Sequence, residues 1–476
     1  MNDLLVMKFG GTSMGSDCRI RVAAQISAEQ KAKRPVVIVV SAMSKVTDLL
    51  LDSLRKAEAG DRADLDVNLQ RLRQRHVETC QALLPGAKQE ATIAGVVSLI
   101  DDFERIANGV RMLGERPPRS VDEAVAIGER LSALMMAAYL ETEGISAVAV
   151  NAAEVIVTDA LFGNASPLMG ATREKAQRVL GTLLADGILP VVTGFNGATA
   201  DGRPTTLGRG GSDFSASTLA ASLDASELWI WTDVDGIMTA DPRLVPDAAV
   251  LPEVTYNEAA ELAYNGAKVL HPRTLAPLIE RKIPVWSKNS FAPEKPGTKI
   301  VPVVEGACGP RAVTSLANVA LVSIEPASPA MSGTKAMAAA MEALTRTNAE
   351  ILIVTSSSYR QNFCFLVRQA ELPIVLERLE EALAMEFLHG YLKPIEVDRS
   401  VGLLAVVGEG MRGTPGLAGR IFTAISREQV NIIAIAQGSS ELTIAIVVHS
   451  AGLEKAVRAV HQECGMANLL TSSGVQ

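Results

Sequence analysis

The sequence predicts an α/β protein with a mostly parallel sheet between helices, followed by two smaller α+β modules. Apolar, β-branched runs such as residues 36–40 alternate with helical segments in the first part of the chain, and such runs are typical of parallel strands buried on both faces. From residue 317 onward the order strand, helix, strand, strand, helix occurs twice, which indicates an internal repeat. Within 476 residues we expect a large domain at residues 1–300 and modules at residues 315–390 and 391–476.

The composition argues against several classes of protein. The formal net charge is −8, which disfavours nucleic acid or an anionic membrane as the main partner. The five cysteines are scattered without a CxxC pair, so we expect reduced thiols and a cytoplasmic protein rather than a disulfide framework or a zinc site. The N-terminus shows no signal-peptide pattern, and no apolar run approaches the ~18 residues of a membrane span.

The first two predicted strands both end in residues suited to a ligand. Residues 4–9 run directly into Gly10 and Gly11, with Lys8 just before the glycines. Glycine N–H groups beside a lysine suit a phosphate, although a lysine at a strand end is otherwise a solvated charge. The second strand, residues 36–40, leads to Ser41, and side chains at the carboxyl end of a parallel strand lie where α/β sheets bind ligands. Helix capping is the alternative for such hydroxyls.

A helical excursion from the sheet is predicted next, and then a long helix over residues 120–139. A Ser-Val-Asp-Glu capping box beginning at Ser120 is expected to open that helix. Within the helix, Glu129 interrupts an apolar stretch. It therefore either pairs with Arg130 or Arg209, or binds a substrate amine.

The glycine-rich loop at residues 206–213 lies between a predicted strand, residues 188–192, and a helix of small residues. Strand, glycine loop and helix place free N–H groups and the positive helix end around an anion. Arg209 offers a planar fork to a carboxylate or phosphate, and Asp213 places a carboxylate at the helix start. An ordinary turn between strand and helix is the alternative.

A later strand, residues 228–231, runs into a loop with three acids and Arg243. Carboxylates there could hold Mg²⁺ or ribose hydroxyls, and a turn with solvated acids is the alternative. Lys268 lies near the end of a predicted helix, residues 256–269, and is a second candidate phosphate ligand.

Four segments together, residues 8–13, 206–213, 231–236 and 266–272, resemble those of aspartate kinases in order and spacing. The resemblance implies an amino-acid kinase domain followed by two ferredoxin-like ACT modules, which the internal repeat fits. The modules look closest to those of bifunctional aspartate kinase–homoserine dehydrogenases, which answer to threonine. The dehydrogenase half is absent from this chain, so we expect a monofunctional enzyme.

The resemblance implies ATP- and Mg²⁺-dependent phosphorylation of the L-aspartate β-carboxylate to 4-phospho-L-aspartate. This is the first step of lysine, threonine and methionine biosynthesis, with feedback by threonine or lysine at the ACT modules. A homodimer or homotetramer built through those modules is also implied. Two other hypotheses stay open: an inactive amino-acid sensor, and a kinase for another amino acid such as glutamate. Glu129 favours a substrate with a free amine.

The family's site residues carry over onto matching positions of this sequence. Lys8 and Asp213 look like catalytic residues, and Asp213 is also a candidate metal ligand. The substrate pocket is similar at Ser41, Thr47, Glu129, Phe195 and Arg209. The nucleotide-binding set is Gly10, Gly11, Gly210, Gly211, Ser212, Thr232, Asp233, Arg243 and Lys268. The effector set is Met331, Gly333, Asn348, Thr355, Asn431 and Gln437.

Two positions depart from the family's pattern. Met238 stands where an aromatic residue is common, so adenine or ribose packing is expected to differ. Thr355 stands where the bifunctional relatives carry glutamine, so the response to threonine is expected to differ.

Overall fold

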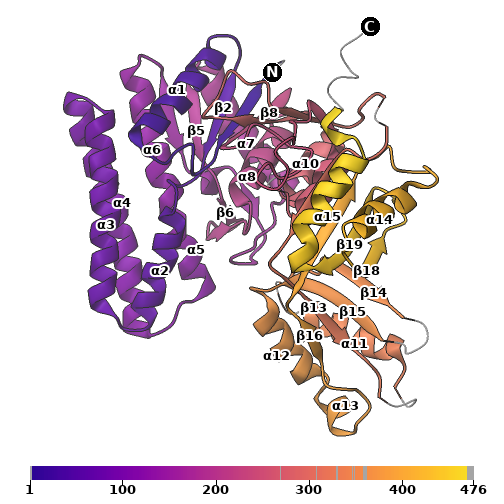
Figure 1. The fold of residues 1–476 in the computed structure, drawn as a ribbon. Helices are drawn as coiled ribbons and strands as arrows, with labels where there is room; N and C mark the ends of the chain where they lie inside the picture. The colour runs from indigo at the N-terminus through magenta and orange to yellow at the C-terminus, as the bar shows by residue number, and fades with distance from the viewer. Residues whose placement is uncertain are drawn as a thin grey trace. The chain divides into compact units, whose positions relative to one another are not determined.

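A computed structural model describes the chain (Figure 1). The described residues are 3–267, 270–306, 308–327, 331–345, 347, 349–357 and 362–468. The chain divides into two compact units. The first comprises Met1–Ile237, Pro252–Tyr256 and Leu270–Val303, and the second comprises Met238–Leu251, Asn257–Val269 and Val304–Gln476. Two short segments that precede residue 300 therefore group with the C-terminal part of the chain.

An eight-stranded sheet forms the framework of the first unit, in the spatial order β3-β5-β2-β1-β8-β10-β11-β9. Neighbouring strands are parallel, except β10 and β11. The strands are β1 (Leu5–Phe9), β2 (Val36–Val40), β3 (Ala147–Val150), β5 (Leu189–Thr193), β8 (Glu227–Thr232), β9 (Glu253–Thr255), β10 (Val285–Asn289) and β11 (Thr298–Val301). Every residue of β1, β2 and β5 is buried, as expected for apolar runs covered on both faces. The predicted α/β fold class is confirmed.

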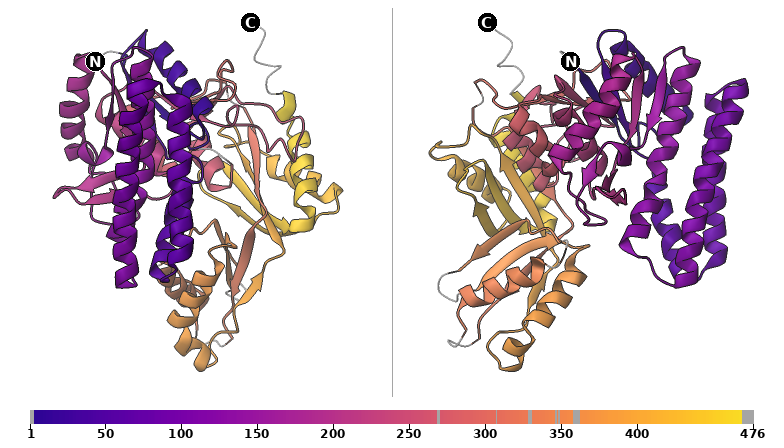
Figure 2. Two further views of the ribbon diagram at one scale, coloured as in Figure 1. Left: turned by 90° about the vertical axis from the view of Figure 1, so that its left-hand side faces the viewer. Right: turned by 180° about the vertical axis from the view of Figure 1, so that it is seen from behind.

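Helices cover both faces of this sheet. On one face α1 and α6 pack, together with α2 to α5, around a core that includes Met7, Ile38 and Leu131. On the other face α8 contacts β1 and β8 and packs against α7 and α10. The helices are α1 (Asp17–Lys31), α2 (Val46–Glu58), α3 (Arg62–Leu83), α4 (Gly86–Leu113), α5 (Pro118–Val125), α6 (Ile127–Thr142), α7 (Met169–Ala185), α8 (Gly211–Ser222) and α10 (Pro272–Arg281). The long helices α3 and α4 lie side by side and extend away from the sheet (Figure 2).

The helix expected over residues 120–139 is in fact two helices, α5 and α6, with Ala126 between them. Because α5 begins at Pro118, Ser120 lies inside it, and no side chain caps its N-terminus. The predicted capping box is therefore wrong. The carboxylate of Asp122, within the same four residues, forms hydrogen bonds with the segment around Thr206 instead.

A small three-stranded sheet in the first unit leads into the glycine-rich loop. It contains β4 (Val157–Thr158), β6 (Asn196–Thr199) and β7 (Pro204–Thr206), in the order β4-β6-β7. Since β7 ends at Thr206 and α8 begins at Gly211, this sheet fixes where the loop starts and the helix fixes where it ends.

The second unit contains two four-stranded sheets, in the orders β14-β15-β13-β16 and β12-β17-β19-β18. The predicted repeat of strand, helix, strand, strand, helix is present twice, as β13-α11-β14-β15-α12 and β17-α14-β18-β19-α15. Each sheet also takes one strand from outside its own repeat, because β12 pairs with β17 and β16 pairs with β13.

The elements of this unit have the following bounds: α9 (Tyr256–Tyr264, whose first residue belongs to the first unit), β12 (Ala312–Leu316), β13 (Val319–Ile324), α11 (Gly333–Thr345), β14 (Ile353–Ser356), β15 (Phe363–Arg368), α12 (Leu372–Ala382), α13 (Ala384–Leu388), β16 (Glu396–Asp398), β17 (Val401–Val407), α14 (Leu417–Arg427), β18 (Ile432–Gln437), β19 (Thr443–His449) and α15 (Ser450–Glu463). Over the part of the chain that the structure describes, none of the helices is both long and apolar enough to cross a membrane.

Candidate active site

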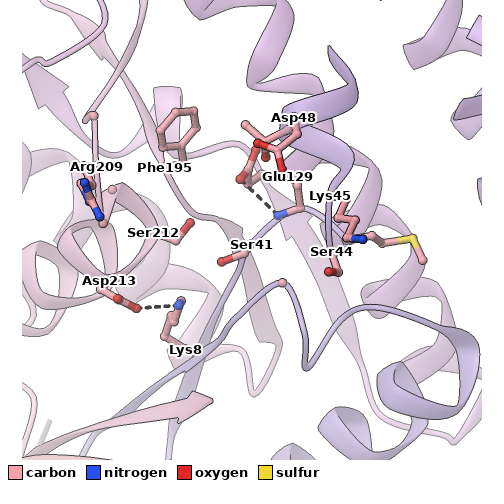
Figure 3. A pocket seen from close by; sticks show the side chains of 17 residues that line it. Lys8, Ser41, Ser44, Lys45, Asp48, Glu129, Phe195, Arg209, Ser212 and Asp213 are labelled. Carbon is pink, nitrogen blue, oxygen red and sulfur yellow. Dashed lines mark hydrogen bonds and ion pairs between the residues drawn. The ribbon is translucent and has the colours of Figure 1, made fainter. Parts of the chain in front are cut away.

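A cavity of about 400 Å³ lies at the carboxyl ends of β1, β2 and β5 in the first unit (Figure 3). We call it the site cavity. Its lining residues are Lys8, Gly11, Ser41, Ala42, Met43, Ser44, Lys45, Thr47, Asp48, Glu129, Phe195, Gly208, Arg209, Gly210, Gly211, Ser212 and Asp213. All the predicted catalytic and substrate-pocket residues line this cavity. They come from five separate stretches of the sequence.

Several residues in the turn after β2 line the cavity although the sequence did not predict them as site residues. The turn after β2 lines the cavity through Ala42, Met43, Lys45 and Asp48 as well as through its hydroxyl residues Ser41, Ser44 and Thr47. The signal for these residues was their position, because α/β sheets bind ligands outside the carboxyl ends of their strands. Residue type alone indicated only the hydroxyl residues of this turn as site residues.

Lys8 and Asp213 form an ion pair at the base of the site cavity. The Lys8 Nζ lies 2.6 Å from the Asp213 Oδ1 (Figure 3). Lys8 is only 8% exposed because it lies on the buried strand β1. The alternative of a solvated lysine at a strand end is therefore excluded, and the ammonium group is held at the cavity by a carboxylate.

The start of α8 supplies backbone donors to the same cavity. Gly210 precedes the helix with a φ of 69°, a conformation that favours glycine. The N–H groups in the first turn of a helix have no partner inside the helix. That of Gly211 donates to the Gly208 carbonyl at 3.0 Å, which leaves those of Ser212 and Asp213 to face an anion. The N–H of Gly211 is therefore used within the loop.

Gly10 also differs from its predicted role. Its N–H donates to the Trp231 carbonyl at 3.1 Å, which joins the loop after β1 to the end of β8. The expectation that Gly10 offers this N–H to a phosphate is therefore not met. The absence of a side chain still matters at the next position, because a Cβ on Gly11 would lie 3.0 Å from the Ala42 carbonyl oxygen.

Glu129 lies on α6 with its carboxylate buried at the cavity wall. Its Oε1 accepts the Ala42 N–H at 3.1 Å, while its Oε2 is buried without a hydrogen-bond partner among the described residues. Burial raises the pKa of Glu129 from 4.5 to about 8, against the opposing effects of the Ala42 N–H and the Lys8 charge. Arg130 and Arg209 are both described, and neither forms an ion pair with Glu129. The Glu129 carboxyl group therefore lines the site cavity without an ion-pair partner among the described residues.

Arg209 lies at the rim of the site cavity and is exposed. The residues on either side, Gly208 and Gly210, have φ angles of 72° and 69°. Phe195 has a positive φ of 70°, and its carbonyl accepts the Leu207 N–H at 2.8 Å. The turn after β5 and the glycine-rich loop are thus joined beside the guanidinium group.

Thr232 and Asp233, which are also predicted to bind nucleotide, are not among the residues that line this cavity. Thr232 ends β8 and is followed by the exposed Asp233, both in the first unit. Arg243 belongs to the second unit and pairs with Asp241 at 2.6 Å. Lys268 lies outside the described residues. Within the described ranges, no group of three or more His, Cys, Asp or Glu residues could hold a metal ion by itself.

A second cavity, of about 350 Å³, lies in the second unit. It is lined by Thr355, Ser356, Ser357, Asn362, Cys364 and Ile432, Ile433, Ala434 and Ile435. Of the predicted effector residues, Thr355 lines it. Gly333 begins α11 near the buried Met331, and Asn431 and Gln437 are exposed at the two ends of β18. Asn348 lies outside the described residues.

Comparisons with known proteins agree with this geometry. Residues 3–289 match the amino acid kinase family, and residues 404–464 match the ACT domain. Bifunctional aspartokinase/homoserine dehydrogenase 1 of Arabidopsis thaliana is 34% identical over 99% of this chain and 52% of its own length. The chain therefore spans about half the length of such bifunctional relatives. Aspartokinase 1 of Arabidopsis thaliana is 31% identical over 96% of this chain and 79% of its own length.

Solved structures are similar over nearly the whole chain. Aspartokinase III of E. coli, in complex with aspartate and ADP (R-state), has a TM-score of 0.82 and 29% identity, and the match covers 97% of this chain and 99% of that one. The same enzyme in complex with lysine and aspartate (T-state) has a TM-score of 0.79 and 28% identity, with the same coverage.

Proposed function

This chain belongs to the amino acid kinase family, and from that premise we propose that it is an aspartate kinase. It transfers the γ-phosphoryl group of ATP to the β-carboxylate of L-aspartate and yields 4-phospho-L-aspartate. The observation that carries the proposal is the site cavity, in which Lys8, Glu129 and Arg209 come together. An amino acid with a free amine and a second carboxylate matches these side chains, because Glu129 can bind the amine while Lys8 and Arg209 carry positive charges that suit anionic groups.

The reaction requires neutralisation of charge rather than a general base. A free carboxylate with a pKa near 3.9 is already ionised at pH 7 and can attack directly. The barrier comes from bringing an anion to a phosphoryl group, so groups that offset negative charge lower it. Lys8 and the N–H groups that begin α8 are placed to do this, and Asp213 holds the Lys8 ammonium in position.

Each substrate group has a proposed partner. Arg209 binds the α-carboxylate through its planar fork. Glu129 accepts the ammonium group at the Oε2 that lacks a partner among the described residues. Ser41, Thr47 and Phe195 complete the pocket, while Thr232, Asp233, Arg243 and Lys268 contact ATP.

Mg²⁺ fits this chemistry. Carboxylate and phosphate oxygens are the ligands that Mg²⁺ takes in nucleotide sites. Asp213 supplies a carboxylate next to Lys8, which is proposed to bind phosphate. The ion would be held by Asp213 and by the nucleotide's own phosphates, and it would offset their negative charge.

The second unit is proposed to bind an amino-acid effector and to join copies of the chain into a homodimer or homotetramer. Its repeat and its second cavity support a regulatory role. The lysine complex of the E. coli enzyme favours lysine as the effector, while the resemblance to bifunctional enzymes favours threonine.

An ATP- and Mg²⁺-dependent hydroxamate assay with L-aspartate tests the proposal. Formation of aspartyl hydroxamate is expected, with L-glutamate and N-acetyl-L-aspartate as poor substrates. Repeating the assay with added threonine or lysine identifies the effector by inhibition. Preference for glutamate or for the N-acetylated substrate would contradict the proposal, and amino-acid binding without turnover would indicate a sensor.

A further inference from the structure

Asp122 is a buried carboxylate that has no part in the reaction described above. It is 1% exposed on α5. Its Oδ2 accepts the N–H groups of Gly163 and Thr206 at 2.8 and 3.0 Å, and its Oδ1 accepts the Thr206 hydroxyl at 2.7 Å. These three hydrogen bonds join α5 to two segments that are distant from it in the sequence.

Asp122 contacts the loop at Gly163 and the end of β7 at Thr206. The loop at Gly163 also packs against the glycine-rich loop that carries Arg209. The Thr206 carbonyl accepts the Ala165 N–H at 2.8 Å. A Cβ on Gly208 would lie 2.6 Å from the Asn164 Oδ1, so the two loops are in close contact there. Thr206 is the last residue of β7, and the glycine-rich loop starts immediately after it.

The loop itself supplies little rigidity at the guanidinium. Arg209 lies between two glycines with positive φ angles, and glycine restricts the backbone less than any other residue. The loop must therefore be fixed at its ends. The start of α8 fixes one end, and β7 together with Asp122 fixes the other.

We propose that Asp122 is a positioning residue that holds the Thr206 end of the loop, and thereby sets where Arg209 meets the substrate carboxylate. The inference rests on the proposed function. Glu129 lies on the helix that follows α5, seven residues further along the chain. The same helical stretch therefore places both proposed aspartate ligands, Glu129 directly and Arg209 through Asp122. The spacing between amine and carboxylate ligands is thus set by one part of the fold.

An asparagine should replace Asp122 with little loss. Its amide oxygen can accept both N–H groups, and its NH₂ can donate to the Thr206 hydroxyl. Burial raises the pKa of Asp122 although its three hydrogen bonds act in the opposite direction, so the uncharged side chain suits this environment. An alanine removes all three contacts.

The test compares Asp122→Ala, Asp122→Asn, Arg209→Ala and the double variant Asp122→Ala with Arg209→Ala in the full chain. Aspartate and ATP kinetics are measured together with aspartate binding by calorimetry and a melting temperature. Asp122→Ala is expected to raise the KM for aspartate roughly 10- to 100-fold, with a much smaller change in the KM for ATP. Asp122→Asn should restore the aspartate KM to within a few-fold of the parent value.

The double variant separates positioning from general damage. If Asp122 acts through Arg209, adding Asp122→Ala to Arg209→Ala should raise the aspartate KM little further, because coupled residues are not additive. Asp61→Ala is the control, since Asp61 accepts a backbone N–H at the start of α3, outside the site cavity. Should Asp122→Ala fail to fold, Thr206→Val removes one of the three bonds and should raise the aspartate KM by a smaller factor.

Two results would overturn the inference in an active parent enzyme. One is an unchanged aspartate KM in folded Asp122→Ala, or in folded Thr206→Val if the alanine variant does not fold. The other is that Asp122→Ala raises the aspartate KM by the same factor in the parent enzyme and in Arg209→Ala. A parent enzyme without aspartate kinase activity would instead overturn the proposed function, and the inference with it.

Discussion

The base and the rim of the site cavity are held in place by different interactions. At the base, Lys8 and Glu129 are 8% and 3% exposed and belong to β1 and α6, where packing fixes the backbone. At the rim, Arg209 is exposed on a loop of glycines, and hydrogen bonds from outside the loop fix its ends. The base therefore holds buried side chains rigidly, which suits the proposed catalytic role of Lys8, while Arg209 at the rim contributes affinity for the substrate. Substitutions at the base and at the rim should therefore separate effects on kcat from effects on the KM for aspartate.

Replacing Lys8 with alanine should have the largest effect, and it should appear in kcat. Removing one preorganised donor to a developing negative charge typically lowers kcat by about 10²–10³-fold. The KM for aspartate should change only a few-fold. Lys88→Ala is a suitable control, because Lys88 also pairs with a carboxylate, that of Glu141, but on the helical surface. A raised aspartate KM with normal kcat would contradict the role assigned to the base.

Replacing Arg209 with alanine should mainly raise the KM for aspartate. A hydrogen bond to a charged group contributes about 1.5–3 kcal/mol, which corresponds to roughly 10- to 100-fold in affinity. Initial rates over a range of aspartate concentrations at saturating ATP measure this change. The division between base and rim would fail if kcat fell by the same factor and the KM stayed constant.

Glu129 should release a proton when aspartate binds. Its pKa is raised to about 8 in the free chain, so at pH 7 it is mostly protonated, and an ammonium group beside it would favour the ionised form. Calorimetry in buffers with different ionisation enthalpies should detect the release of a proton when aspartate binds. Glu129→Gln should abolish that release, and equal release in both proteins would assign the proton to another group.

Glu129 should also influence stability as the pH changes. Because its pKa is raised in the folded chain, the folded state retains a proton that the unfolded state loses above pH 4.5. Its contribution to the free energy of unfolding is therefore full below pH 4.5 and is lost as the pH rises through about 8. Melting temperatures from pH 5 to 8 should fall less in Glu129→Gln than in the parent. A steeper fall in the variant would show that the pKa is not raised.

Much of the fold follows from local patterns in the sequence. Apolar runs such as residues 36–40 identify strands buried on both faces, and the repeated order of elements identifies the two C-terminal modules. The glycines and charged residues at the strand ends indicated most of the site cavity, because parallel strands bring their carboxyl ends to one edge of a sheet. Period and composition are properties of short segments, so the sequence alone could reveal them.

Contacts between distant segments were decided only by the tertiary structure. The sequence left open whether Glu129 pairs with an arginine, and only its packing beside Ala42 settled that it does not. The Gly10 N–H donates to the Trp231 carbonyl, and the Asp122 carboxylate accepts hydrogen bonds from Thr206. The strands β12 and β16, which lie outside both repeats, pair with strands of the repeats. The physical reason is that hydrogen-bond partners and desolvation depend on which distant residues pack nearby, and no local pattern encodes that choice.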